Sequence, residues 1–289
     1  MASLCRLATR TASEKRFLTS LRPERARFLA TAPAYPGHIP LTWFENAFLL
    51  VGAGLMTLAD SRRGVTLSLD LVAVVGETSA GPSLRRLRDI MLESPEGRKI
   101  LKQRPRINTS TLDMNKLAQL PEGTFGRAYT TWLERCRVTP DTRAPVHYID
   151  DPELAYVMQR YRECHDFYHC ICNMPVNVES ELAIKYFELA NLGLPMAGFS
   201  AALYPWRLNS TKRHKVFSEY APWALKCGSS ARSLITVFWE ERWEQNIKDM
   251  RREFGIWDGP PAKWPKPLKG TREKQASTEG AEKSVSLDM

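Results

Sequence analysis

Residues 150–181 read DDPELAYVMQRYRECHDFYHCICNMPVNVESE and contain the clearest secondary-structure signals in the chain. The segment Asp150-Asp151-Pro152-Glu153 has an acidic cap, proline at the first helical position and an acid in the first turn, which is typical of a helix start. Apolar residues then recur at helical spacing, at Leu154, Met158, Tyr161, Tyr168 and Cys172. The pattern predicts one helix to about Cys172, a stop at Pro175, and a second helix that begins after the cap residue Asn177.

The rest of the body has the same periodicity. Apolar residues three and four positions apart recur in almost every segment, whereas alternation at every second residue is scarce. Further helices are predicted over about Val65–Gly76, from Gly81 to about Leu92, from Ser94, around Tyr129 and over about Ser230–Phe254. The sequence therefore predicts an all-α fold with a single helical domain.

The two ends of the chain differ in composition from the body. Residues 1–30 carry seven Lys or Arg against two Glu among Ser, Thr, Leu and Ala, which is typical of a mitochondrial transit peptide, although a basic arm without a targeting role has the same composition. The last thirty residues are rich in Pro, Lys, Ser and Glu. We therefore predict a transit peptide over residues 1–32, a helical domain over 33–259 and a disordered basic tail over 260–289.

The net charge of +9 lies mostly in these two ends. Residues 31–259 carry 28 Lys or Arg against 26 Asp or Glu. A body this close to neutral lacks the basic stripe that binding to a phosphate backbone requires, and no nucleic-acid-binding motif is present. Nucleic acid is therefore not expected as the partner.

The longest apolar run, Ala47–Ala59, has thirteen residues, and a helix needs about twenty to cross a bilayer. The sequence thus predicts no transmembrane helix. Gly52-Ala53-Gly54 within this run lacks the third glycine and the βαβ context of a dinucleotide-binding loop. Close packing of helices is the expected reason for these glycines.

The chain has six cysteines, and removal of a transit peptide that contains Cys5 would leave five. An odd number argues against a disulfide framework, and a reducing matrix would keep the side chains as thiols. We expect no disulfide.

The segment His165-Asp166-Phe167-Tyr168-His169 places two imidazoles four residues apart, so both can bind one ion from the same helix face. Asp166 flanks the first histidine, and Glu181 follows His169 by twelve residues, on the next helix. His165, Asp166, His169 and Glu181 therefore predict a metal site between two antiparallel helices. Two nitrogens with up to two carboxylates suit zinc, and also cobalt, manganese or iron.

Other interpretations of this motif stay open. A histidine on an apolar helix face can be a core residue with one hydrogen bond, and nearby acids can serve only to accept that bond. Cys172 lies at i+7 from His165 and is a competing ligand, although a buried cysteine usually acts as a small apolar residue. Asp after the first histidine argues against a metalloprotease. A phosphohydrolase with an HD motif needs further ligands, and His38, His147 and His214 are in no comparable motif.

Six of the eight tryptophans lie at or after position 206. Several of them alternate with basic residues: Trp206, Trp223, Trp239 and Trp243 with Arg207, Lys212, Arg213, Lys215 and Arg242. This composition is typical of a membrane-interface surface, and it is equally typical of aromatic residues that pack helices together.

From about Tyr35 to Asp258 the sequence resembles the mitochondrial coenzyme Q (ubiquinone) biosynthesis family of 4-hydroxy-3-methoxy-5-polyprenylbenzoate decarboxylase, the fourth numbered coenzyme Q protein. The segments that carry the resemblance include Ser61-Arg62-Arg63-Gly64, Gly76-Glu77-Thr78, Arg104-Pro105-Arg106, Gly123-Thr124-Phe125-Gly126 and Gly193-Leu194-Pro195-Met196. The hallmark of the family is HDxxH, eleven further residues and Glu, which His165, Asp166, His169 and Glu181 match without departure. Asn173 stands where the family often has glycine.

The resemblance implies that all four residues are metal ligands, with zinc as the first expectation for the metal. It implies a carboxy-lyase that removes the C1 carboxylate of a polyprenylated hydroxybenzoate, by simple or oxidative decarboxylation. It also implies a peripheral location on the matrix face of the inner mitochondrial membrane, in a complex with other coenzyme Q biosynthesis enzymes, and it leaves a homo-oligomer open. The alternative is a non-catalytic scaffold that binds prenyl lipid and has a structural metal.

Overall fold

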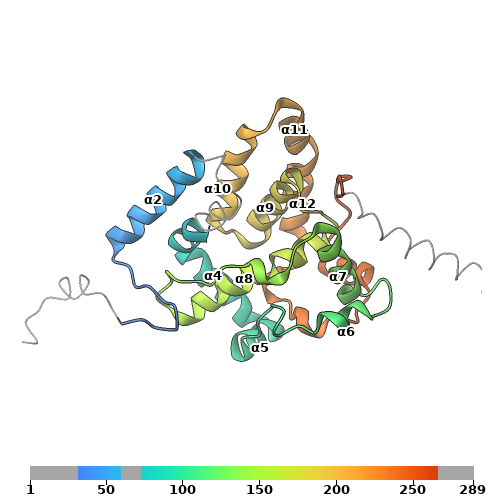
Figure 1. Cartoon of the computed structure of the whole chain (residues 1–289), viewed down its shortest axis with the longest axis horizontal. Helices are drawn as coiled ribbons and strands as arrows, with labels where there is room; N and C mark the ends of the chain where they lie inside the picture. The colour runs from blue at the N-terminus through green and yellow to red at the C-terminus, as the bar shows by residue number, and fades with distance from the viewer. Residues whose placement is uncertain (1–31, 60–72, 266–289) are drawn as a thin grey trace, which may run out of the picture. The chain divides into compact units, whose positions relative to one another are not determined.

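The computed structural model describes residues 32–59 and 73–265 (Figure 1). Every regular element in these ranges is a helix, and one isolated β-bridge joins Thr124 and Asn246. The all-α prediction is confirmed. The predicted transit peptide up to residue 31, the predicted helix up to residue 72 and the predicted tail from residue 266 lie outside the described residues.

Contacts divide the chain into two compact units. Of the described residues, the first unit comprises 32–59, 73–81 and 145–155, and the second comprises 82–144 and 156–265. The metal motif lies in the second unit.

The first unit contains helix α2 (Trp43–Ala59) and a helical segment over residues 73–79. The Glu77 carboxylate accepts hydrogen bonds from the backbone N–H groups of His147 and Tyr148 at 2.7 and 2.6 Å, and thereby holds the segment that precedes α8. Apart from neighbouring residues of α2 itself, no described residue lies within 4 Å of a Cβ built on Gly52 or Gly54, so the described residues do not show the close helix packing predicted there. None of the described helices is both long and apolar enough to cross a membrane.

The other elements are α4 (Gly81–Glu93), α5 (Pro95–Gln103), α6 (Met114–Ala118), α7 (Phe125–Cys136), η2 (Pro140–Thr142), α8 (Pro152–Ile171), α9 (Val178–Leu192), α10 (Pro195–Leu203), η3 (Tyr204–Arg207), α11 (Ser210–Lys215), η4 (Val216–Tyr220), α12 (Ala221–Ser230), η5 (Leu234–Thr236), η6 (Trp239–Glu241) and α13 (Ile247–Phe254). In the second unit, α9 packs against both α10 and α12.

Local caps explain where several helices begin and end. The Ser94 side chain accepts a hydrogen bond from Gly97 N at the start of α5. Asn177 does the same for Ser180 N at the start of α9, which ends at Gly193 in the left-handed region with φ 63°. The predicted starts of α4, α5, α8 and α9 are confirmed. Those of α5, α8 and α9 rest on hydrogen bonds between residues two or three positions apart in sequence.

The continuous helix predicted over Ser230–Phe254 is wrong. In its place α12 ends at Ser230, two short 3-10 turns follow, and α13 begins only at Ile247. The Asn191 side chain replaces helical hydrogen bonds here, since it donates to the carbonyl groups of Gly228, Ala231 and Arg232 and accepts from Leu234 N.

The apolar residues of this segment are buried although they do not share one helix. Trp239 is fully buried, with its ring centroid 5.3 Å from the rings of both Phe125 and Phe167. Trp243 stacks on Phe125 at 5.3 Å with an interplanar angle of 3°. The apolar pattern therefore predicted correctly that these residues are buried. Their packing against aromatic residues of α7 and α8 favours short turns over one continuous helix.

Candidate metal centre

His165 and His169 on α8 and Glu181 on α9 form a compact group in which one ligand atom from each residue lies within 4.8 Å of the others. The two Nε2 atoms are 3.2 Å apart. Glu181 oxygens lie 3.5 Å from Nε2 of His165 and 3.3 Å from Nε2 of His169. The i, i+4 spacing on α8 produces the imidazole pair, and the cap at Asn177 positions the first turn of α9 beside it.

These separations fit a single bound ion. Ligand atoms at about 2.0–2.1 Å from a tetrahedral metal lie about 3.3–3.4 Å from one another. The Nε2–Nε2 distance and the two Glu181 distances, from Oε2 to His165 and from Oε1 to His169, fall close to that value. Two imidazole nitrogens and one carboxylate oxygen are also the ligand types that zinc and similar divalent metals bind.

Glu188 is a buried carboxylate behind the group. Its oxygens lie 2.5 Å from Nδ1 of His165, 2.8 Å from the Tyr161 hydroxyl and 2.7 Å from Nζ of Lys185. Burial raises the pKa of Glu188, but Lys185 and His165 lower it by a larger amount, and the resulting pKa is about 2. Glu188 is therefore ionised and accepts the Nδ1–H of His165, which leaves the Nε2 lone pair available for a metal.

The charges around the group favour a cation. Partial burial raises the pKa of Glu181, but both histidines lower it by more, so this pKa lies well below the usual range. Burial and Lys185 lower the pKa of His165, whereas Glu188 and Glu181 raise it, and the net shift is upward. Both histidines are buried, and the Glu181 side chain is 38% exposed. The group can thus be approached from the side of Glu181.

Asp166, the fourth residue of the motif, points elsewhere. It is 2% exposed, and its carboxylate pairs with the Arg143 guanidinium rather than joining the group of three. Neighbouring residues on a helix project in directions about 100° apart, so Asp166 does not share the face of His165. Its role as a metal ligand stays a prediction. Arg143 and Glu188 were not singled out from the sequence, because no motif links them to the histidines.

Cys172, considered as a competing ligand, is buried and lies outside the group. Burial raises the pKa of its thiol well above the ordinary value, as it does for Cys164 and Cys170. All five cysteines in the described ranges are free thiols. This agrees with the expectation of no disulfide.

Reagent access provides a test of the buried thiols. In native protein we expect Cys164, Cys170 and Cys172 to be alkylated on the order of 100-fold more slowly than in urea, because burial blocks access and disfavours the thiolate. Half-buried Cys136 serves as the internal control. Peptide mapping after timed alkylation measures each site, and labelling of Cys164 as fast as Cys136 would contradict the packing of α8.

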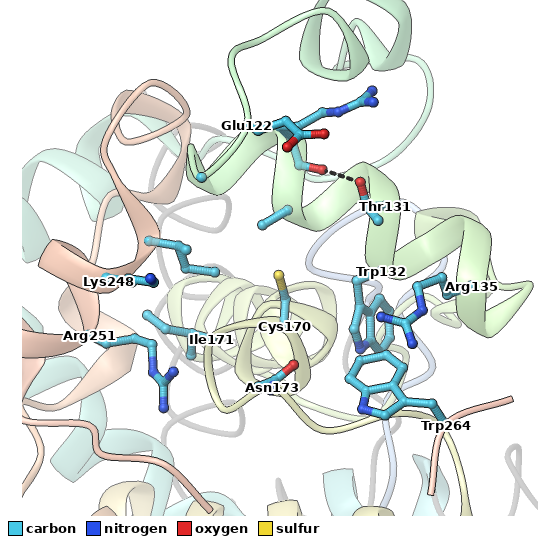
Figure 2. Close-up of a pocket in the computed structure, with 14 residues that line it drawn as sticks. Glu122, Thr131, Trp132, Arg135, Cys170, Ile171, Asn173, Lys248, Arg251 and Trp264 are labelled. Carbon is cyan, nitrogen blue, oxygen red and sulfur yellow. Dashed lines mark hydrogen bonds between the residues drawn. The ribbon is translucent and has the colours of Figure 1, made fainter. Parts of the chain in front are cut away.

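A cavity of about 350 Å³ lies between α7, the end of α8 and α13 (Figure 2). Its lining includes Arg127, Arg135, Lys248 and Arg251 but only one acid, Glu122. Trp132 lines the cavity and also lies beside the group of His165, His169 and Glu181, with its ring centroid 5.6 Å from that of His169. The cavity and the metal group therefore share one side-chain wall.

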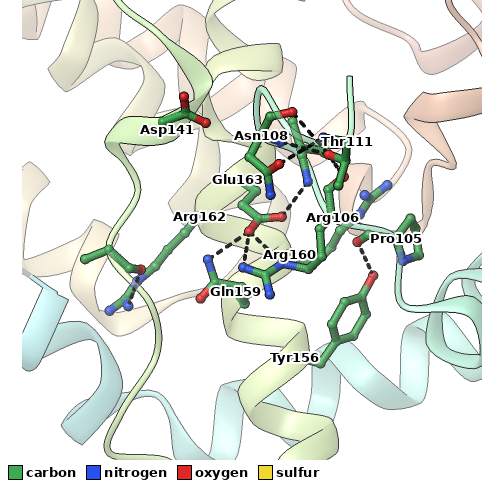
Figure 3. A network of polar contacts seen from close by, with 12 residues as sticks. Pro105, Arg106, Asn108, Thr111, Asp141, Tyr156, Gln159, Arg160, Arg162 and Glu163 are labelled. Carbon is green, nitrogen blue, oxygen red and sulfur yellow. Dashed lines mark hydrogen bonds and ion pairs between the residues drawn. The ribbon is translucent and has the colours of Figure 1, made fainter. Parts of the chain in front are cut away.

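A second buried carboxylate on α8, Glu163, connects this helix to the loop after α5 (Figure 3). It lies 2.6 Å from the Arg106 guanidinium and accepts hydrogen bonds from Ile107 N at 2.8 Å and from the Gln159 amide at 3.0 Å. Tyr156 donates to Pro105 O at 3.0 Å beside it. The network fixes the loop against the helix that carries both histidines.

Glu163→Ala is expected to lower the free energy of unfolding by about 3 kcal/mol, because it leaves the buried Ile107 N–H and the Gln159 amide without their acceptor. Urea unfolding followed by circular dichroism measures the change. Exposed Glu134 on α7 offers the control, and Glu134→Ala should change the same quantity by less than about 0.5 kcal/mol. Equal effects of the two substitutions would contradict the role of Glu163.

Comparison with known proteins identifies the family. Residues 35–260 match the family of coenzyme Q (ubiquinone) biosynthesis protein Coq4. The chain belongs to this family. The resemblance stated from the motifs is therefore confirmed, and it covers both histidines and Glu181.

Relatives in the coenzyme Q biosynthesis family extend over most of the chain. The mitochondrial ubiquinone biosynthesis protein COQ4 of Coprinopsis cinerea is 67% identical over 275 residues, which cover 94% of this chain and 93% of that protein. The protein of the same name from Yarrowia lipolytica is 47% identical over 242 residues, covering 82% and 90%. A crystal structure of a putative ubiquinone biosynthesis protein from Nostoc punctiforme, 21% identical, shares the fold with a TM-score of 0.59 over 73% of this chain and 98% of that one.

Proposed function

We propose that this protein is a metal-dependent decarboxylase of mitochondrial ubiquinone biosynthesis that removes the C1 carboxylate of 4-hydroxy-3-methoxy-5-polyprenylbenzoate. The observation that carries the proposal is the His165, His169 and Glu181 group, whose separations match those around one ion. The membership of the chain in the coenzyme Q biosynthesis family supports the substrate class. Zinc is the first expectation for the metal, with cobalt, manganese and iron as alternatives.

A divalent metal, when bound, stabilises the phenolate charge that develops on the ring or orients the carboxylate that leaves. Residues of the chain orient the ligands and exclude water from one side of the site. Glu188 fixes the ring orientation of His165, and burial of both histidines keeps water from their side of the site. The exposed side of Glu181 is the direction from which the benzoate reaches the site.

The ring chemistry sets what the residues have to do. An electrophile adds to C1 of the para-hydroxylated ring, the C1–CO2 bond then breaks, and its electron pair returns to the ring. In simple decarboxylation the electrophile is a proton. In oxidative decarboxylation one atom of dioxygen bonds to C1, and the other leaves as water after an external reductant supplies two electrons and two protons. Because the pKa of Glu181 is held well below its usual range, Glu181 acts as a carboxylate ligand and not as the acid that delivers a proton.

The same proposal includes the location and the partners. The family relatives are named mitochondrial, which supports action in the mitochondrion. A polyprenyl tail is insoluble in water, so the enzyme works peripherally at the matrix face of the inner membrane, beside other enzymes of quinone synthesis. Asp166, held by Arg143, is a fourth ligand only if this ion pair opens.

The scaffold alternative is favoured by one observation, the burial of both histidines, since structural metal sites are closed to solvent. Turnover separates the two functions. The full chain is loaded separately with zinc, cobalt, manganese and iron, and supplied with prenylated hydroxybenzoate with and without oxygen, and products are identified by mass. Metal-dependent loss of CO2 supports the enzyme, and its oxygen dependence distinguishes the two reactions. A folded, metal-loaded protein without turnover under any of these conditions would favour the scaffold.

A further inference from the structure

The four tryptophans that lie among basic residues in the sequence differ in their exposure to solvent. Trp239 is fully buried, Trp223 is 9% exposed, and Trp243 stacks on Phe125. Arg242 is held by Glu96 at 2.7 Å and by Glu253 at 2.9 Å. Trp206 alone among the four is largely exposed, at 69%. Of these four tryptophans, Trp206 is therefore the one available to a membrane-interface surface.

Other large apolar side chains are exposed next to Trp206 in the sequence, on α10, η3 and η4. They are Phe199, Leu203, Tyr204 and Phe217, each between 42% and 49% exposed. These elements lie together in space, because η3 packs against α10, η4 packs against α11, and the Arg213 guanidinium lies 5.7 Å from the Trp206 ring centroid. In Figure 1 the chain rises through α10 and turns over into α11 at the upper edge of the view.

The charged side chains of residues 195–217 are all basic, and the next acid along the chain is the exposed Glu219 on η4. Residues 195–217 contain Arg207, Lys212, Arg213 and Lys215 and no Asp or Glu. Glu179 from α9 lies 3.2 Å from Lys212 and pairs with it across the fold. Amphipathic aromatic side chains together with Lys and Arg are typical of surfaces that bind anionic bilayers.

Helix α2 in the other unit offers a contrast. It exposes Phe44, Phe48, Val51 and Leu55 to 60% or more, but it contains no Lys or Arg. An apolar face without basic residues has no charge that would select an anionic bilayer over another apolar surface. The combination of exposed aromatic and basic residues is found around Trp206.

We propose that the surface formed by Phe199, Leu203, Tyr204, Trp206 and Phe217, with Arg207, Lys212, Arg213 and Lys215, docks this protein onto an anionic lipid bilayer. The aromatic side chains enter the headgroup region and the basic ones contact lipid phosphates. The inference specifies which surface provides the membrane location included in the proposed function. It is tested by binding to vesicles, so its failure is distinguishable from failure of the decarboxylase proposal.

The charge contribution is tested with the full chain and vesicles of phosphatidylcholine with about one-fifth cardiolipin. K212Q/R213Q/K215Q is expected to weaken the partition coefficient on the order of 100-fold, because each basic residue near such a surface contributes about fivefold. The control K102Q/K248Q/R252Q removes the same charge from exposed positions on α5 and α13 and should change binding by less than about threefold. Equal losses in the two variants, or equal binding of the parent to pure phosphatidylcholine, would overturn the proposal.

The aromatic contribution is tested separately. W206A is expected to weaken binding about tenfold. Brominated lipid should quench part of the tryptophan fluorescence of the parent, and this quenching should be absent in W206F. F44S/F48S on α2 should bind as the parent does. Loss of binding in F44S/F48S together with unchanged binding in W206A would assign docking to α2 and overturn the proposal. Circular dichroism checks that each variant is folded, and turnover of a soluble short-chain substrate should be equal in all of them.

Discussion

His169→Ala is expected to weaken zinc affinity by more than about 100-fold and to reduce decarboxylation to the background rate. The substitution removes one of three ligand atoms, and the remaining pair, His165 and Glu181, cannot hold an ion with comparable affinity. The helix should persist, because His169 has no hydrogen-bond partner at Nδ1 among the described residues and alanine favours helix. Zinc competition with a chromophoric chelator and product analysis by mass measure the two effects.

The control for this experiment is His214→Ala on α11, an exposed histidine outside the metal group. It should leave both zinc affinity and turnover unchanged. Retained turnover in a folded His169→Ala protein would show that the group is not catalytic. Loss of the fold in this variant, with the metal-free parent also unfolded, would instead support a structural metal.

Glu188→Gln is expected to weaken zinc affinity about 10- to 100-fold while every metal ligand remains. The charged carboxylate accepts the Nδ1–H of His165 and makes its Nε2 a better ligand, and a neutral amide of the same size supports this less well. The same carboxylate interacts with Lys185 and the Tyr161 hydroxyl, so the variant also leaves the partly buried Lys185 ammonium without its counter-charge.

Two further variants separate these effects. Glu179→Gln, on the same helix and paired with Lys212, should leave zinc affinity unchanged. Lys185→Met together with Glu188→Gln removes the unpaired ammonium and should restore stability but not zinc affinity. Zinc affinity equal to that of the parent in Glu188→Gln would show that the contact with His165 does not tune the site.

Local signals in the sequence were sufficient for much of the helical framework. The caps Ser94 and Asn177 and the start at Asp150–Glu153 act within one turn, so their effect does not depend on distant residues. The i, i+4 spacing of His165 and His169 places both imidazoles on one face of any helix that contains them. The grouping of His165, His169 and Glu181 could therefore be predicted once two helices with a short connection were recognised.

Contacts between residues far apart in sequence decided the remainder. The periodic apolar residues of 230–254 predicted one helix, but burial of Trp239 against α7 and α8 and the hydrogen bonds of Asn191 gave short turns instead. Asp166 pairs with Arg143, which is 23 residues away in sequence, and no sequence motif indicated the contact between Glu188 and His165. Helix propensity and caps are properties of neighbouring residues and can be read along the chain, whereas burial and ion pairing depend on which distant surfaces meet when the chain folds.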